Sequence, residues 1–223
     1  MAAPVSLFAR LYAAGYDRFT ARLNRRGAED HRRRLVEDAP GAVLEVGAGT
    51  GWNLRHYRSA GRVVALEPHP GMRARAERRA REASVPVEVI DGDGMALPFP
   101  DASFDTVVFG FVLCTIPDPA RALAEGRRVL RPGGQVRFLE HVRATDPKLA
   151  RWQDRVNRPW RRVAGGCRAN QDTASMIPTA GLHIERLERC ECPAAAPRFC
   201  RPHIFGEARP AAPLGGADVE RTA

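Results

Sequence analysis

The segment VLEVGAGTG at residues 43–51 constrains the fold of this chain more than any other feature. A short apolar run containing Glu45 leads into three glycines at alternate positions, Gly47, Gly49 and Gly51. Glycine readily adopts the positive φ of a tight turn and lets the backbone approach a ligand closely. The pattern therefore predicts a buried strand, a ligand-binding turn and the start of a helix.

Strands and helices alternate along the chain after this turn. The expected strands are RVVALEP, VPVEVIDGD, FDTVVFGFVL and QVRFLEHV, and the last two, GLHIERLERCEC and FCRPHIFGEARP, are expected to form a hairpin. The expected helices are GMRARAERRAREAS, with its alanines on one face, and IPDPARALAEGRRVL, with Asp118 as its N-cap and Pro119 in its first turn. This order predicts an α/β fold with a doubly wound, mainly parallel, seven-stranded sheet and helices on both faces.

We expect one domain over residues 1–209, because 223 residues suffice for one core of ordinary size. Residues 1–39 are expected to form a helical lid. Residues 143–180 break the alternation and are expected to form a helical cap over one edge of the sheet. The tail at 210–223 is expected to be disordered.

The charge of the chain is +9, with 35 basic residues of which Lys148 is the only lysine. We interpret this as the residue bias of a GC-rich genome, and the arginines are spread along the chain, so we expect no nucleic-acid partner. The apolar runs are too short for a signal core or a membrane span, so we expect a soluble, cytoplasmic protein with reduced thiols. The cysteines Cys190, Cys192 and Cys200 are a poor zinc pattern, and we expect no metal.

An acidic residue placed after the turn narrows the classes of ligand that the turn could bind. Glu67 ends the second strand, 20 residues after Gly47, where a carboxylate binds ribose hydroxyls in nucleotide-binding βαβ units. The glycine spacing is G-x-G-x-G rather than the G-x-G-x-x-G of dinucleotide folds. Glu45 beside the turn would repel a pyrophosphate but would attract an ammonium group, directly or through water. A cationic amino-acid ligand carrying a ribose therefore fits better than a dinucleotide.

In these residues the chain resembles the class I S-adenosylmethionine-dependent methyltransferases. The matching segments are VLEVGAGTG, LEP at 66–68, GDGMALPFPDASFD at 92–105 and VLRPGGQV at 129–136. The resemblance implies that S-adenosylmethionine is bound through its methionine part, its ribose and its adenine. The residues it implies for this cofactor are Tyr16, Glu45, Gly47, Ala48, Gly49, Gly51, Glu67, Pro68, Asp93, Gly94, Met95 and Phe111.

The second half of the chain resembles the methyltransferase-like subgroup that methylates small thiols. The matching segments are FVLCTIPDP, FLEHVRA, WQDRVNRPW, GGC at 165–167 and RPHIFG at 201–206. Animal members of this subgroup carry a hydrophobic N-terminal membrane anchor. Since no such apolar segment is recognisable in this sequence, we expect a soluble, bacterial relative. The best-supported acceptor is a small, partly apolar thiol. O- or C-methylation of a quinone or phenol, N-methylation of a phospholipid, and a non-enzymatic, arginine-rich binder of nucleic acids or anionic surfaces remain alternatives.

Glu140 and His141 end the fifth expected strand, at the edge where α/β sheets bind ligands. Adjacent strand residues point to opposite faces, so we expect one of the two to reach the acceptor. We predict that this is the catalytic residue His141, acting on a thiol proton or thiolate, and that Glu140 turns towards the cap or the other face. A structural histidine bonded to Glu140 remains an alternative. Cys114, Trp160 and His203 are further candidates for lining the acceptor pocket.

Overall fold

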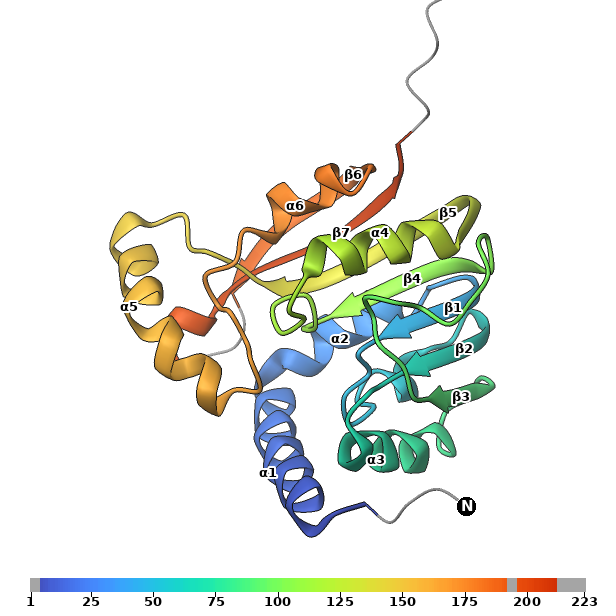
Figure 1. Cartoon of the computed structure of the whole chain (residues 1–223), viewed down its shortest axis with the longest axis horizontal. Coiled ribbons are helices and arrows are strands. Elements are labelled where there is room, and N and C mark those ends of the chain that lie inside the picture. Colours follow the sequence, from blue (N-terminus) through green and yellow to red (C-terminus); the bar gives the residue numbers. More distant parts are fainter. Residues whose placement is uncertain (1–4, 192–195, 212–223) are drawn as a thin grey trace, which may run out of the picture.

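The computed structural model describes residues 5–191 and 196–211, so Cys192 and the tail from residue 212 lie outside the described part. A seven-stranded sheet with the order β3-β2-β1-β4-β5-β7-β6 forms its centre (Figure 1). The four pairings that involve β1 to β5 alone are all parallel, whereas β7 is antiparallel to both β5 and β6. The strands are β1 (Gly41–Val46), β2 (Ala60–Leu66), β3 (Val87–Ile90), β4 (Phe104–Gly110), β5 (Leu130–His141), β6 (Leu182–Glu191) and β7 (Pro202–Pro210). The expected fold class and the C-terminal hairpin are confirmed.

Helices cover both faces of the sheet, because the central strands are apolar on both sides. Val107 and Phe109 pack on one face beneath α4 (Pro119–Val129) and α6 (Thr173–Thr179). Val108, which lies between them in the sequence, packs on the other face with α2 (Glu29–Val36) and α3 (Pro70–Ala80). Asp118 caps α4 by accepting a 3.0 Å hydrogen bond from the Arg121 amide, as the sequence predicts.

The segment after the glycine turn departs from the prediction. In place of the expected helix start there is a single 3₁₀ turn, η2 (Leu54–His56). The chain re-enters the sheet at Ala60, so only eight residues, 52–59, connect the turn to β2, and the Asn53 side chain bonds Glu45 beneath the turn. The glycine turn therefore does not lie at the N-terminus of an α-helix.

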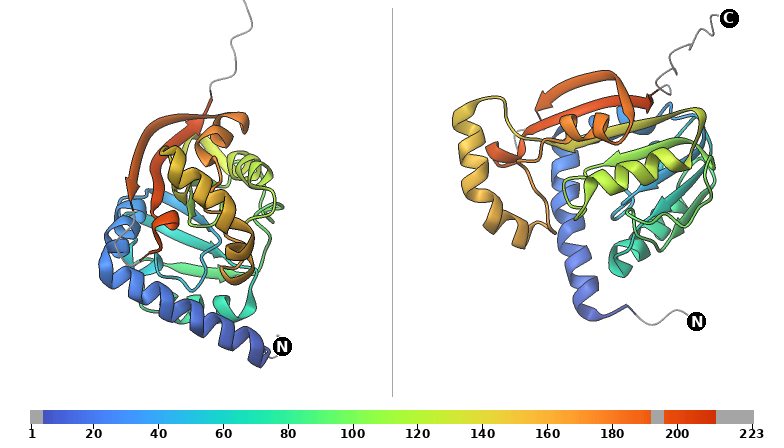
Figure 2. Two further views of the ribbon diagram at one scale, coloured as in Figure 1. Left: turned by 90° about the vertical axis from the view of Figure 1, so that its left-hand side faces the viewer. Right: turned by 45° about the horizontal axis from the view of Figure 1, so that its top comes forward.

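The N-terminal segment forms α1 (Leu7–Leu23), a wide turn η1 (Asn24–Ala28), and then α2. The helical path is broken in η1, where Gly27 has a φ of 106° that other residues rarely adopt. The arm formed by α1 packs against α3 and lies beside the carboxyl ends of the parallel strands (Figure 2). Leu7, Phe8 and Leu11 on its outer face are exposed. That this arm acts as a lid stays a prediction.

Residues 143–180 form α5 (Pro147–Val163), a loop and α6, and α5 stands beside the same edge of the sheet as α1 (Figure 1). The buried Gln153 amide ties α5 to three other segments. Its Nε2 donates to the carbonyls of Val142, Ala169 and Phe199, and its Oε1 accepts from the Ala144 amide. The cap is thereby attached to the end of β5 and to η3 (Arg198–Cys200) before β7.

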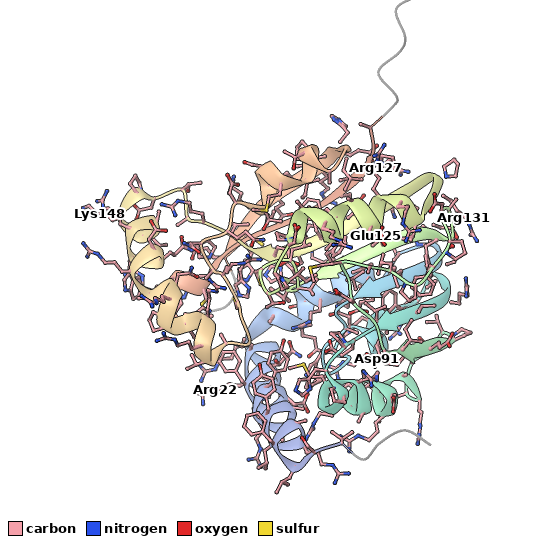
Figure 3. All side chains as sticks on the ribbon, viewed as in Figure 1. Arg22, Asp91, Glu125, Arg127, Arg131 and Lys148 are labelled. Atoms are coloured by element: carbon pink, nitrogen blue, oxygen red, sulfur yellow. The ribbon has the colours of Figure 1, made fainter. Side chains whose placement is uncertain are left out.

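The charged side chains labelled in Figure 3 belong to separate parts of the molecule. Arg22, Arg131 and Lys148 stand on α1, on β5 and on α5, and they do not gather on one face. Within residues 5–191 and 196–211, no helix combines the length and apolar character needed to cross a membrane.

Candidate active site

Two neighbouring cavities lie at the carboxyl edge of the parallel strands. The larger encloses about 480 Å³ between the sheet edge, α1 and the cap, and the smaller, of about 20 Å³, lies at the glycine turn. Tyr16, Thr20, Arg32 and Phe111 belong to the walls of both. A ligand at the glycine turn and a second ligand in the larger cavity would therefore be neighbours.

The glycine turn is held by bonds within the protein. The amides of Gly47 and Ala48 both donate to the carbonyl of Leu66, at 2.8 and 3.0 Å. All three glycines have positive φ, 69° at Gly47, 59° at Gly49 and 82° at Gly51. A Cβ at Gly47 would lie 2.2 Å from a Val112 methyl, whereas a Cβ at Gly49 would meet only the Tyr16 ring, at 3.9 Å. Gly47 is therefore required for packing, and Gly49 leaves the space in front of the turn open.

Glu67 lies directly behind the opening at Gly49. Its Oε2 accepts from the Gly49 amide and its Oε1 from the His69 amide, both at 2.8 Å. Burial raises the pKa of Glu67, and these two hydrogen bonds oppose the rise. Pro68 is exposed, and its carbonyl accepts from Arg73. The carboxylate thus lies at the turn as expected, and its contact with a ribose stays a prediction.

Glu45 lies beneath the turn, 2 % exposed. Its two oxygens accept hydrogen bonds from Asn53 at 2.8 Å and from the Tyr57 hydroxyl at 3.0 Å. Burial raises the pKa of Glu45 to about 7, and the two hydrogen bonds limit the rise. These contacts indicate that Glu45 holds the turn in place from beneath. Its contact with an ammonium group stays a prediction.

The predicted adenine-binding segment forms a small turn after β3. The Met95 amide donates to Asp93 Oδ1 at 2.8 Å, and Asp93 forms a bridge with Ala96. A Cβ at Gly94 would lie 2.8 Å from a Val46 methyl, so only glycine fits there. Asp93 itself is exposed, whereas the Met95 side chain is half-buried against the core. The turn presents one carboxylate and one apolar side chain, the pair expected to flank an adenine.

Helix α1 is attached to the glycine turn by Asp17, which the sequence analysis did not single out. Asp17 accepts from the Trp52 indole at 2.9 Å and pairs with Arg75 at 3.0 Å and with Arg79 at 2.9 Å. Tyr16, one residue earlier, lines both cavities. The only signal in the sequence was an acidic residue within a basic, amphipathic helix, which does not identify a partner.

Glu140 and His141 separate onto opposite faces, as strand alternation predicts. Glu140 is fully buried and binds the loop after β4 by accepting from the amides of Val112 at 2.8 Å, Leu113 at 2.9 Å and Cys114 at 3.3 Å. Burial raises its pKa to about 7, although the three amides favour the carboxylate. Glu140 therefore holds a loop of the site, and its partner is that loop rather than the cap.

His141 lines the larger cavity beside two cysteines. Its Nδ1 lies 3.6 Å from Cys114 Sγ and 3.9 Å from Cys167 Sγ. A hydrogen bond between the two thiols is the largest cause that lowers the pKa of Cys167, and the charge of His141 and the Trp160 indole lower it further against the effect of burial. Burial disfavours the charged form of His141, but Cys167 and Glu140 outweigh this and raise its pKa. Cys114 was a candidate for lining the acceptor pocket, whereas Cys167 appeared only within the matching segment GGC at 165–167.

The rest of the wall of the larger cavity is mostly aromatic and apolar. Trp160 and His203 line the cavity, as expected, together with Tyr12 and Phe19 of α1. His203 Nδ1 donates to the Arg201 carbonyl at 2.5 Å, which leaves Nε2 buried with no partner. Burial lowers the pKa of His203 well below the ordinary value, so its free nitrogen is an acceptor.

Phe111 and Arg32 separate the two cavities. Phe111 has a φ of 60°, which is rare for a residue with a side chain and costs about 1–3 kcal/mol. Its ring contacts His141 and His203 at centroid distances of 5.3 and 5.4 Å, and the Arg32 guanidinium lies 4.9 Å from its centroid. Phe111 was expected to contact the cofactor, whereas the sequence analysis did not single out Arg32.

Known proteins resemble the chain in sequence and in fold. A family model described as a methyltransferase domain matches residues 44–138. Human thiol S-methyltransferase TMT1B is 35 % identical over 173 residues, which cover 75 % of this chain and 70 % of that protein. Demethylmenaquinone methyltransferase of Renibacterium salmoninarum is 44 % identical over 119 residues, covering 51 % of this chain and 48 % of that protein.

A solved structure of a putative methyltransferase from Bacillus halodurans superposes with a TM-score of 0.63 at 19 % identity. The match covers 81 % of this chain and 96 % of that one, and it supports the fold alone. The similarity to the thiol methyltransferase covers more of the chain than the 95 residues that the family model matches. The chain therefore belongs to the class I S-adenosylmethionine-dependent methyltransferases.

Proposed function

We propose that this chain transfers a methyl group from S-adenosylmethionine to the sulfur of a small, partly apolar thiol. The observation that carries the proposal is the larger cavity, whose mostly apolar walls end in Cys114, His141 and Cys167 and which shares wall residues with the smaller cavity at the glycine turn. The similarity to TMT1B, which covers 75 % of this chain, supports the same acceptor.

The residues at the glycine turn fit the cofactor. Gly49 leaves open space where the methionine part would lie, and Glu67 stands behind that space with a carboxylate for the ribose. Asp93 is exposed beside Met95, where the adenine would lie. The cofactor supplies a methyl group on a sulfonium, and the protein has to place an acceptor atom in line with it.

The acceptor side supplies a group that stabilises a thiolate. A thiol reacts as its anion, and an anion in an apolar cavity needs a nearby cation or hydrogen-bond donor. His141 occupies that position on the cavity wall, with Phe111 fixing one side of its ring. Methylation of a phenol or quinol ring is the second candidate, because aromatic side chains line a cavity of about 480 Å³.

A panel of acceptors tests the proposal. Purified protein is incubated with S-adenosylmethionine and, separately, with aliphatic thiols, aromatic thiols, phenols, quinols and amines, and products are identified by mass spectrometry. We expect apolar thiols to be methylated fastest. His141→Ala is expected to lower the turnover number at least about tenfold with the cofactor Kd nearly unchanged, because His141 does not line the turn cavity. Methylation of phenols or amines with no thiol product would refute the thiol assignment.

A further inference from the structure

Three side chains with metal-binding atoms converge at the inner end of the larger cavity. Cys114 comes from the loop after β4, His141 is the last residue of β5, and Cys167 follows α5. The two Sγ atoms and a ring nitrogen of His141 all lie within 4.8 Å of one another. Both cysteines are buried, at 1 % and 6 % exposure.

The spacing matches a tetrahedral zinc ion. Zinc lies about 2.3 Å from a thiolate sulfur and about 2.0–2.1 Å from an imidazole nitrogen, which in tetrahedral geometry puts sulfur and nitrogen about 3.6 Å apart. The observed separations from His141 Nδ1 are 3.6 Å for Cys114 Sγ and 3.9 Å for Cys167 Sγ. Both separations lie within a few tenths of an ångström (about 0.3 Å) of the tetrahedral value.

The backbone around the three side chains already holds them together. Glu140 fixes the amide of Cys114, and the amide of Arg168 donates to the Cys114 carbonyl at 2.8 Å. Glu140, next to His141, and Arg168, next to Cys167, are thus joined to Cys114 by backbone bonds that a metal would not have to replace. Two thiolates and a neutral imidazole would cancel the charge of a divalent ion, which suits largely apolar walls.

We propose that Cys114, His141 and Cys167 form a mononuclear zinc site whose fourth position opens into the larger cavity. Three protein ligands with one open position are typical of catalytic zinc sites, whereas structural sites have four. The sequence analysis expected no metal, because it considered only Cys190, Cys192 and Cys200. The three residues proposed here are 27 and 26 residues apart along the chain and form no recognisable spacing.

The open position gives the proposed thiol acceptor a place to bind, and this part rests on the proposed function. Each cysteine releases its proton when zinc binds, and the acceptor thiol releases its proton as its sulfur becomes the fourth ligand. That sulfur then bonds the methyl carbon while the bond between methyl and sulfonium breaks, and the electron pair stays on the cofactor's sulfur. Zinc changes neither its charge nor its oxidation state.

Metal analysis and cobalt spectroscopy test the site without relying on activity. The whole chain is purified with a phosphine reductant and without chelators, and zinc is measured by mass spectrometry. Chelator-treated protein is then titrated with Co²⁺. We expect about one zinc per chain and, with cobalt, a thiolate charge-transfer band and tetrahedral ligand-field bands that saturate at one equivalent.

Variants identify the ligands. Cys114→Ala, Cys167→Ala and His141→Asn are expected to lose the bound zinc and the cobalt charge-transfer band, or to weaken metal affinity at least about a hundredfold. Cys190→Ser is the matched control, because this half-buried cysteine on β6 is outside the cluster, and it should keep both signals. Far-ultraviolet circular dichroism of each variant verifies that the chain is folded.

The outcomes separate the two proposals. No bound zinc together with no cobalt bands in the unaltered chain would overturn the metal site, even if a thiol is methylated. Equal loss of metal in Cys190→Ser and Cys167→Ala would overturn it as well. Normal cobalt bands with no methylation of any thiol would leave the metal site standing and refute the proposed acceptor. A shift of the cobalt bands on adding an aliphatic thiol would support both.

Discussion

The two sides of the site are built in different ways. The cofactor side uses neighbouring residues, since the turn, Glu45 beneath it and Glu67 behind it all belong to two adjacent strands and the loop between them. The acceptor side collects Cys114, His141, Cys167 and His203 from four segments, and α1 closes its wall. Local backbone geometry therefore maintains the cofactor side, whereas long-range packing maintains the acceptor side.

The largest effect is expected at Gly47, with Gly49 as its matched control. Alanine at either position has to adopt a left-handed conformation, at about 1–2 kcal/mol, and at Gly47 it also collides with Val112. We expect Gly47→Ala to lower the free energy of unfolding by about 3–5 kcal/mol and Gly49→Ala by about 1–2 kcal/mol, measured by urea unfolding. Gly49→Ala should still weaken cofactor binding at least about tenfold. Equal losses of stability would contradict this division of roles.

A change in the cap tests whether the acceptor side can be disturbed without affecting the cofactor side. Gln153→Ala removes four hydrogen bonds and leaves buried carbonyls without donors, so it should destabilise the chain by about 2–4 kcal/mol. We expect the acceptor KM to rise while the cofactor Kd, measured by calorimetry, changes less than about twofold. Arg151→Ala, at an exposed position on the same helix, serves as the control. A cofactor Kd that rises in parallel with KM would show that the two sides are coupled.

Glu45 should make stability depend on pH. Burial raises its pKa from 4.5 to about 7 in the folded chain, so between these pH values the folded chain binds more protons than the unfolded chain. The free energy of unfolding should therefore fall as pH rises from 4.5 to 7, by at most about 1.4 kcal/mol per pH unit, and level off above 7.

Glu45→Gln should remove this contribution. The stability of the variant relative to the unaltered chain is expected to increase between pH 5 and pH 7, and urea unfolding at several pH values measures it. The comparison is relative because Glu140, which also has a pKa of about 7, is present in both proteins. Two curves that stay parallel over this range would contradict the assignment.

The smallest effect is expected at the attachment of α1. Asp17→Asn weakens the pairs with Arg75 and Arg79 and should raise the cofactor Kd about three- to tenfold. This corresponds to about 0.7–1.4 kcal/mol, which is within the range for one intramolecular hydrogen bond. The difference should shrink at high salt. Asp30→Asn is the control, since Asp30 forms only an exposed pair with Arg33 on α2. A similar change in both variants would mean a general charge effect.

Most of the fold could be predicted because its signals are local. The alternation of apolar strands and capped helices predicted the sheet, and the Asp118 cap was confirmed. The helix expected after the glycine turn was wrong, because residue composition does not reveal that the chain returns to the sheet after eight residues. Asn53 and Tyr57 instead donate hydrogen bonds to Glu45, and these are tertiary contacts.

In the candidate site, too, the residues with local sequence signals were predicted and those brought together by tertiary packing were not. The residues of the glycine turn were predicted from one motif, and the opposite directions of Glu140 and His141 followed from the period of a strand. The meeting of Cys167 with Cys114 was not predicted, because their segments are brought together only by the packing of the cap on the sheet. Asp17 and Arg32 were missed for the same reason, since nothing near them in the sequence identifies their partners.

The break at Gly27 has a consequence for the course of turnover. The non-helical break at Gly27 separates α1 from α2, and α1 carries Tyr16, which borders both cavities. If α1 acts as the predicted lid, it has to swing out about this break before the cofactor enters at the glycine turn, and the acceptor cavity is complete only after it returns. We therefore expect an obligatory sequence of events, with the cofactor binding first and the demethylated cofactor leaving last.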